Sequence, residues 1–284
     1  MPEFLSRPFS TETLSPGQRI ALRVEYDGSR YSGWQAQAQL PKVRTVQTEV
    51  ETALSKIADC PVRVFCAGRT DTGVHATAQW LHFDAPCARS LKAWIVGANA
   101  QLPMDVRLAD GLSVNEDFHA RHSAVARQYD YLIANSRTPS ALLANRIVWV
   151  RQPIDEVLMH RSLQDLLGEC DFSAFRAASC QSTTPMRFME SAQVFRRGEF
   201  VQIRVVANAF LHHMVRNIVG SCLQVGLGEQ PQSWLKDLLA QRDRTRAAAT
   251  APPHGLYLTG VRYPDSLQVR SATDLPFFPS AAQE

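Results

Sequence analysis

The sequence predicts an α+β protein made of two consecutive α+β halves. Short segments with strand-like alternation of apolar and polar residues are interleaved with segments of helical periodicity. This alternation occurs twice along the chain, and 284 residues suffice to form two small domains or one large one. We expect a polar leader over residues 1–18, an N-terminal half over 19–112, a C-terminal half over 113–264 and a loosely packed tail over 265–284, with the halves joined near residues 110–116.

The first half is predicted as strand, helix, strand, strand, helix, strand. Residues 19–26, RIALRVEY, alternate and run into the turn DGSR, which indicates a strand. Val46, Val50 and Leu54 fall on one helical face, and Thr45 before them is a suitable N-cap. The remaining elements are expected as strands at 62–66, 77–84 and 105–109 and a helix at 90–102.

The second half repeats this alternation. Residues 192–207 predict a hairpin that closes at Arg197 and Gly198. The apolar segment 208–226 has the length of a buried helix, and Pro231 suits the first turn of another helix. Strands are expected at 126–135 and 255–263, and further helices at 154–168 and 231–241.

Composition narrows the class of protein. The chain is 45% hydrophobic and 20% charged, as a folded globular protein is, and has no run of about 18 apolar residues to cross a membrane. The six cysteines are scattered without a Cys-x-x-Cys pair, so we expect reduced thiols of a cytosolic protein, mostly filling the core. Only four of the 30 basic residues are lysines; this arginine bias suits a polyanionic ligand and equally suits a GC-rich genome.

The segment CAGRTDTGVHA, residues 66–76, places Arg69 and Asp71 between Gly68 and Gly73. Asp-Thr-Gly is also the aspartic-protease triplet, but that site needs a second such triplet, or a dimer that supplies one, and the chain has no second triplet. An adjacent arginine would also keep Asp71 ionised, which opposes a shared proton. A simple tight turn accounts for the glycines, but it does not require an arginine, an aspartate and a histidine within seven residues.

GRTDTGVHA resembles the G-R-T-D-A-G-V-H-A signature of the TruA family of tRNA pseudouridine synthases. The resemblance continues in family order over roughly residues 19–264. Its further blocks are EYDGSRYSGWQ (25–35), TVQTEVETAL (45–54), FHARHSA (118–124), RQYDYLIAN (127–135), DFSAFRA (171–177), NAFLHHMVRNIVG (208–220) and GLYL (255–258).

This resemblance implies the pseudouridine synthase fold, with antiparallel or mixed sheets that form one catalytic cleft. It implies a cytoplasmic homodimer that isomerises uridine to pseudouridine at positions 38, 39 and 40 in the anticodon arm of tRNA, without a cofactor. The C1′–N1 bond breaks, the uracil rotates, and C5 bonds to C1′. A non-catalytic tRNA-binding protein on the same fold is the alternative, and the intact catalytic matches disfavour it.

The resemblance also implies roles for individual residues. Asp71 is expected to be the nucleophile, and carboxylates do attack anomeric carbons in retaining glycosidases. Whether Asp71 attacks C1′ or C6 stays open. Tyr129 would stack on the uracil, Arg216 would pair with Asp71, Leu256 would line the uracil pocket, and Arg69 would take part in flipping the base out of the helix.

Further residues are expected to contact tRNA by resemblance: Arg89, Phe118, His119, Ala120, Arg121, His122, Arg137, Ser179, Cys180, Gln181, Ser182 and Thr183. Gln128 and Asp130 stand where the family usually has arginines, which could weaken backbone contacts locally. His212 and His213 would point about 100° apart on the predicted helix, so we assign no metal site.

Overall fold

The computed structural model describes residues 9–37 and 43–269, which form two compact units. The first contains residues 9–72, 76–124 and 261–269 of the described chain, and the second contains residues 73–75 and 125–260. The chain passes into the second unit after Ala124 and not at the expected joint of 110–116, since the strand expected at 105–109 continues to Val114 in the first unit. Residues 270–284 of the expected tail lie outside the described residues.

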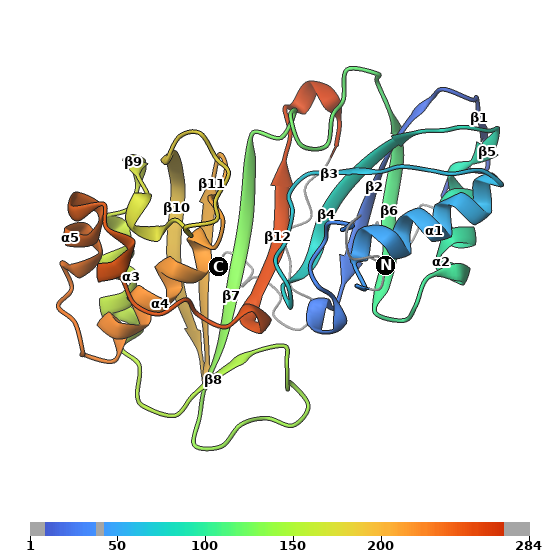
Figure 1. The fold of residues 1–284 in the computed structure, drawn as a ribbon. Coiled ribbons are helices and arrows are strands. Elements are labelled where there is room, and N and C mark those ends of the chain that lie inside the picture. Colours follow the sequence, from blue (N-terminus) through green and yellow to red (C-terminus); the bar gives the residue numbers. More distant parts are fainter. Residues whose placement is uncertain (1–8, 38–42, 270–284) are drawn as a thin grey trace. The chain divides into compact units, whose positions relative to one another are not determined.

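The first unit has an antiparallel sheet in the order β6-β2-β4, with β3 paired to β4 (Figure 1). Helix α1, a π-helical segment at Ala93–Gly97 and α2 pack on one another and on β6. The bounds are β2 Arg19–Tyr26, α1 Val46–Ala58, β3 Phe65–Cys66, β4 His75–Asp84, α2 Ala98–Gln101 and β6 Val106–Val114.

Several predictions for the first unit are confirmed. Strand β2 has the predicted bounds, and α1 begins after Thr45, whose hydroxyl accepts from Thr48 N–H. The strand expected at 62–66 is only Phe65–Cys66, because the preceding backbone bonds to α1 instead. Val62 N–H donates to the Ser55 hydroxyl at 2.9 Å, and Val64 N–H donates to Glu51 Oε1 at 3.0 Å.

The leader is not wholly loose, which corrects the prediction for residues 1–18. Within it, β1 (Thr13–Leu14) pairs antiparallel with β5 (Arg89–Ser90). Gly17 N–H also donates to Ala85 O at 2.7 Å. The described part of the leader therefore belongs to the first unit. The cysteine prediction is also partly wrong: all six thiols are free, but only Cys222 is buried.

The second unit has a sheet in the order β12-β7-β11-β10-β9, in which β8 adds to β7 in parallel (Figure 1). Helix α3 packs on β10 and on α4, and α5 packs on α3 and α4. The bounds are β7 Ala126–Asn135, β8 Val148–Val150, α3 Glu156–Gln164, β9 Gly168–Asp171, β10 Met186–Arg197, β11 Phe200–Ala207, α4 Met214–Gly226, α5 Trp234–Gln241 and β12 Leu256–Arg262. Short 3₁₀ turns occur at Gly28–Arg30, Ser173–Phe175, Arg244–Arg246, Pro253–Gly255 and Asp265–Leu267.

The predicted strands and hairpin of the second unit are confirmed, and the hairpin turns at residues 198–199. Helix α4 starts at Met214 rather than at residue 208, because His213 takes a left-handed conformation with φ of 60°. No helix among residues 9–37 and 43–269 is long and apolar enough to span a membrane.

Asp130 on β7 is fully buried and holds together three strands of the second unit. Its carboxylate accepts from Arg204 Nε at 2.8 Å and Gln202 Nε2 at 2.7 Å on β11. On the other side, it accepts from the Thr259 hydroxyl of β12 at 2.6 Å. Gln128 Nε2 also donates to Thr259 Oγ1, at 3.1 Å. Asp130 is therefore an internal ion-pair residue, and its side chain is not available to contact tRNA.

We predict that Asp130→Asn lowers the free energy of unfolding by about 2–4 kcal/mol, because it leaves Arg204 without its buried counter-charge. The affinity for tRNA should stay within about twofold of the wild type, because the Asp130 side chain is buried. Urea unfolding and filter binding measure the two quantities. A stable Asp130→Asn protein with weakened tRNA binding would contradict this assignment.

Candidate active site

The loop that holds Asp71 is fixed by Thr70, which is buried. The Thr70 hydroxyl lies 2.8 Å from the Tyr26 hydroxyl, and Trp34 N–H donates to the Thr70 carbonyl at 3.0 Å. Gly33 approaches so closely that a Cβ there would lie 2.6 Å from Thr70 O, and its φ of +87° also favours glycine. The backbone entering Asp71 thus has little freedom to move.

The strand end before this loop is fixed as well. Ala67 N–H donates to Trp80 O at 2.7 Å, and the fully buried Gln79 bonds through its amide to both backbone groups of Gly68. Asp71 itself is half-buried, and Arg69 is exposed. Backbone and side-chain bonds on both sides of Arg69 therefore determine where its guanidinium and the Asp71 carboxylate can reach.

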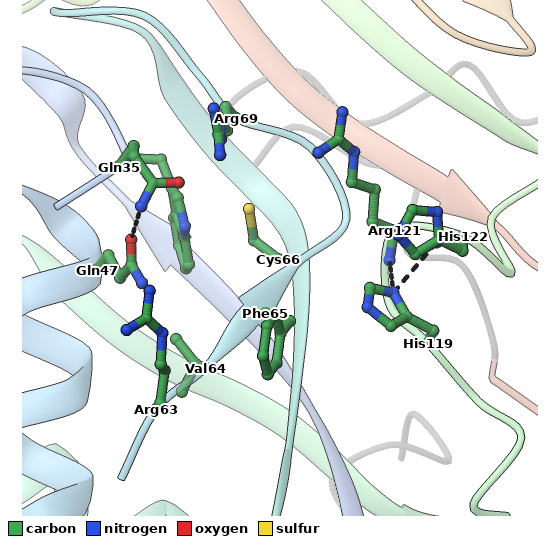
Figure 2. Close-up of a pocket in the computed structure, with 11 residues that line it drawn as sticks. Gln35, Gln47, Arg63, Val64, Phe65, Cys66, Arg69, His119, Arg121 and His122 are labelled. Carbon is green, nitrogen blue, oxygen red and sulfur yellow. Dashed lines mark hydrogen bonds between the residues drawn. The ribbon is translucent and has the colours of Figure 1, made fainter. Parts of the chain in front are cut away.

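A pocket of about 240 Å³ opens beside this loop within the first unit (Figure 2). It contains four residues that the sequence predicted as RNA contacts, namely Arg69, His119, Arg121 and His122. The other lining residues were not predicted: Trp34, Gln35, Gln47, Arg63, Val64, Phe65 and Cys66. Among these, Arg63 and Phe65 gave the only signal in the sequence, as a charged and an aromatic residue just before the motif.

The segment 118–122 reaches the pocket because its alternate residues are anchored in the core. Phe118 and Ala120 are fully buried, so their side chains position this segment and do not themselves face RNA. Ala120 N–H donates to His82 Nδ1 at 3.1 Å, and Ala120 O accepts from the Tyr263 hydroxyl at 2.8 Å. The residues between and after them can then face the pocket.

Two ionisable groups near the pocket are neutral at physiological pH. Burial raises the pKa of the Cys66 thiol to about 12, against the opposing charges of Arg69 and Arg121, so Cys66 is a poor nucleophile. Burial, together with the neighbouring His119, lowers the pKa of His82 to about 4. A neutral His82 can keep accepting the hydrogen bond from Ala120.

The second unit contains the other expected catalytic residues. Tyr129 is buried on β7, with its ring edge-to-face against Phe210 at 5.1 Å between centroids. Arg216 Nε donates to Ala251 O at 2.8 Å, and Ala251 N–H donates back to Arg216 O at 3.1 Å. Leu256 is buried at the start of β12. Tyr129, Arg216 and Leu256 belong to the second unit and Asp71 to the first, and the pairing of Arg216 with Asp71 stays a prediction.

The expected contact segment 179–183 is a loop supported by Arg176, whose guanidinium donates to Cys180 O at 2.8 Å and Ser182 O at 2.7 Å. Ser179 Oγ lies 3.0 Å from His212 Nδ1. Gln181 and Thr183 are exposed.

The geometry assumed for His212 and His213 was wrong, because both residues precede α4. Their ring centroids lie 4.0 Å apart rather than pointing to separate helix faces.

Arg89 and Arg137 do not line the pocket of Figure 2. Arg89 is exposed on β5, and its Nε donates to Ile57 O at 3.3 Å at the end of α1. Arg137 is exposed two residues after β7. Both remain predicted tRNA contacts.

A carboxylate on a fixed loop beside an arginine-lined pocket is an arrangement that suits an enzyme with a polyanionic substrate. The family model described as tRNA pseudouridine synthase matches residues 22–122 and 163–264. Proteins named tRNA pseudouridine synthase A from Salmonella paratyphi B, Salmonella newport and Salmonella heidelberg are each 51% identical over 269 residues, which is 95% of this chain and 98% of each relative. The chain belongs to the tRNA pseudouridine synthase family, of the TruA type, and is an isomerase.

Among solved structures, one titled "Crystal Structure of a Cbf5-Nop10-Gar1 Complex" is similar at a TM-score of 0.29 and 12% identity. That similarity covers 72% of this chain and 54% of the other.

We predict that Gly33→Ala lowers the free energy of unfolding by about 2–4 kcal/mol, since the added Cβ meets Thr70 O and the residue keeps a positive φ. Pseudouridine formation should fall by about 10- to 100-fold in protein that is still folded, because Asp71 follows Thr70 directly. Gly17→Ala is the matched control: its φ is +85°, but no atom lies within 4 Å of the added Cβ. Equal effects of the two substitutions would contradict the role of this contact.

Acid should destabilise the protein through His82. Its pKa is lower in the folded than in the unfolded chain, so the unfolded state binds more protons between about pH 6.5 and 4, and stability falls as pH falls through that range. His82→Asn keeps an acceptor for Ala120 N–H and cannot be protonated. Urea unfolding at pH 7 and pH 4.5 should show a smaller loss for His82→Asn than for the wild type. Equal losses would show that folding does not lower the pKa of His82.

Proposed function

We propose that this protein isomerises uridine to pseudouridine at positions 38, 39 and 40 of the tRNA anticodon arm, with Asp71 as the nucleophile. The observation that supports this most strongly is the anchoring of the Asp71 loop through Thr70 and Gly68. A carboxylate on a fixed loop reaches a reacting atom without the entropy cost of ordering that loop. The anticodon-arm positions are taken from the resemblance to the TruA family.

The reaction is an isomerisation, so it needs no electron donor or acceptor. Asp71 attacks either C1′ of the ribose or C6 of the uracil, and the C1′–N1 bond breaks. The uracil turns within the site and C5 bonds to C1′. The Asp71 carboxylate leaves C1′ as that bond forms, or is eliminated from C6 after it; the C5 proton leaves, and N1 gains a proton. Tyr129 holds the base by stacking and assists at C5, and Leu256 supplies an apolar wall for the turning ring. No cofactor or metal enters this proposal.

Arg216 pairs with Asp71 in this proposal and so holds the carboxylate in position. Its guanidinium is oriented by the bond from Nε to Ala251 O. The exchange of bonds between Arg216 and Ala251 supports a fixed position for this arginine.

Arg69 takes the place of the flipped base or holds its phosphate. Extruding a stacked base costs a few kcal/mol, which a neighbouring cation or planar group can offset. Arg69 is exposed, and it has no hydrogen-bond or ion-pair partner among the described residues. Its guanidinium is therefore available to the RNA.

The wider tRNA contacts come from the exposed groups of the predicted set. Arg121 and His122 supply contacts at the pocket, whereas Phe118 and Ala120 hold that segment in place. Arg89, Arg137 and the loop at 179–183 extend the surface. The proposal includes a cytoplasmic homodimer in which both subunits contact one tRNA.

We predict that Asp71→Ala and Asp71→Asn bind tRNA within about threefold of the wild type and form no pseudouridine. The measurement is the release of tritium to water from unmodified tRNA labelled at uracil C5, combined with filter binding. Tritium release by either variant at the wild-type rate would disprove Asp71 as the nucleophile. Tight binding without any release by the wild type would instead indicate a non-catalytic tRNA-binding protein.

We also predict that Arg69→Ala binds tRNA but modifies it at least about tenfold more slowly at saturating enzyme, because flipping is impaired. Single-turnover rates at saturation separate this effect from affinity. Arg161, exposed on α3, provides the control as Arg161→Ala and should behave as the wild type. A variant of Arg69 that regains the wild-type rate at saturation would show that the residue acts in binding alone.

A further inference from the structure

We infer that the pocket of Figure 2 binds a second, unpaired nucleotide of the RNA substrate, distinct from the uridine that is modified. This inference rests on the proposed RNA substrate and adds a specificity subsite beside the reacting group. None of Asp71, Tyr129, Arg216 and Leu256 lines this pocket. Its lining instead offers three features that one nucleotide needs: an aromatic surface, a fixed acceptor and cations.

The aromatic surface is Phe65. It is 49% exposed, although it lies on a strand paired to a buried one. Its ring is stacked on the buried cross-strand partner His82, at 5.2 Å between centroids and 25° between planes. His82 supports the ring from within, so Phe65 can offer a base a rigid surface with little loss of rotamer freedom.

The fixed acceptor is Gln35, and its orientation follows from a chain of hydrogen bonds. Gln47 Nε2 donates to the Glu51 carboxylate at 2.8 Å, which can only accept. Gln47 Oε1 therefore accepts, and it does so from Ala36 N–H at 3.0 Å and from Gln35 Nε2 at 2.7 Å. The remaining polar atom, Gln35 Oε1, receives no donor from the described residues.

An acceptor held in this way recognises an N–H on the edge of a base. Unpaired bases present such groups, whereas the bases of a duplex use them for pairing. Gln35 lies across the pocket from Phe65 in Figure 2, with its oxygen directed toward the centre. The arrangement suits a base that stacks on one wall and donates to the other.

The cations are Arg63, Arg69 and Arg121, and no acidic residue is among the eleven that line the pocket. Arg63 and Phe65 are two apart on an extended segment, so their side chains leave it on the same side. Arg63 and Arg69 have no hydrogen-bond or ion-pair partner within the part of the chain that the structure describes. Guanidinium groups at the rim can therefore hold the phosphates of a nucleotide whose base enters the pocket.

The direct test is a double-mutant cycle between Phe65 and the RNA. Dissociation constants are measured for wild type and Phe65→Leu with tRNAs that carry one abasic nucleotide, placed in turn at each position of the anticodon arm. At one unpaired position other than the modified uridine, removing the base should weaken wild-type binding by about 5- to 20-fold. The same removal should have little effect on Phe65→Leu, because the stacking is already lost.

Phe65→Tyr keeps the ring and should restore the wild-type pattern. Phe188→Leu is the control, since Phe188 is 48% exposed on β10 and lies far along the chain from the pocket residues. Additive effects at every position, coupling only at the modified uridine, or the same coupling for Phe188→Leu would each overturn the inference. Because the readout is affinity, loss of coupling while the wild type still releases tritium would overturn the pocket assignment alone.

A second measurement tests the cations. Arg63→Ala should reduce the slope of log affinity against log salt concentration by about one, whereas Arg161→Ala should leave the slope unchanged. An unchanged slope for Arg63→Ala would contradict a phosphate contact at this rim.

Discussion

The contact between Gly33 and Thr70 is the constraint on which the site of the first unit depends. It brings the backbone that follows β2 and the 3₁₀ turn against the backbone that precedes Asp71, closely enough to exclude a Cβ. Trp34 N–H and the Tyr26 hydroxyl then bond to Thr70 from the same region. A catalytic carboxylate that was free to move would lose much of its advantage, because small displacements of a reacting group are costly.

The pocket depends on the same constraint. Its walls come from Trp34 and Gln35, which follow Gly33, from residues 63–66 before the loop, and from the segment near His119. Glu51 on α1 ties two of these walls, because it accepts from both Gln47 and Val64 N–H. One hydrogen-bonded framework therefore sets both the position of the Asp71 carboxylate and the shape of the pocket. Such a framework suits an enzyme that must recognise nucleotides around its target.

Much of the fold followed from local pattern. The alternation of β2, the N-cap at Thr45 and the hairpin at 192–207 are properties of the residues themselves. The errors arose where contacts or backbone conformation override the pattern: Val62 and Val64 bond to α1, and the left-handed His213 delays the start of α4 to Met214. Asp71 and Arg69 were recognisable from their motif. The roles proposed for Phe65 and Gln35 could not be inferred in this way, because they depend on contacts with His82 and Gln47.

The most direct test of the account is the single-turnover rate of Asp71→Glu on unmodified tRNA at saturating enzyme. Glutamate keeps the charge and lengthens the side chain by one methylene. The backbone at this position has little freedom to shift and make room for it. We predict a rate at least about 100-fold below that of the wild type with tRNA affinity unchanged. A rate within a few-fold of the wild type would contradict the account, because a negative charge near the base would then suffice and the anchored position of Asp71 would not matter.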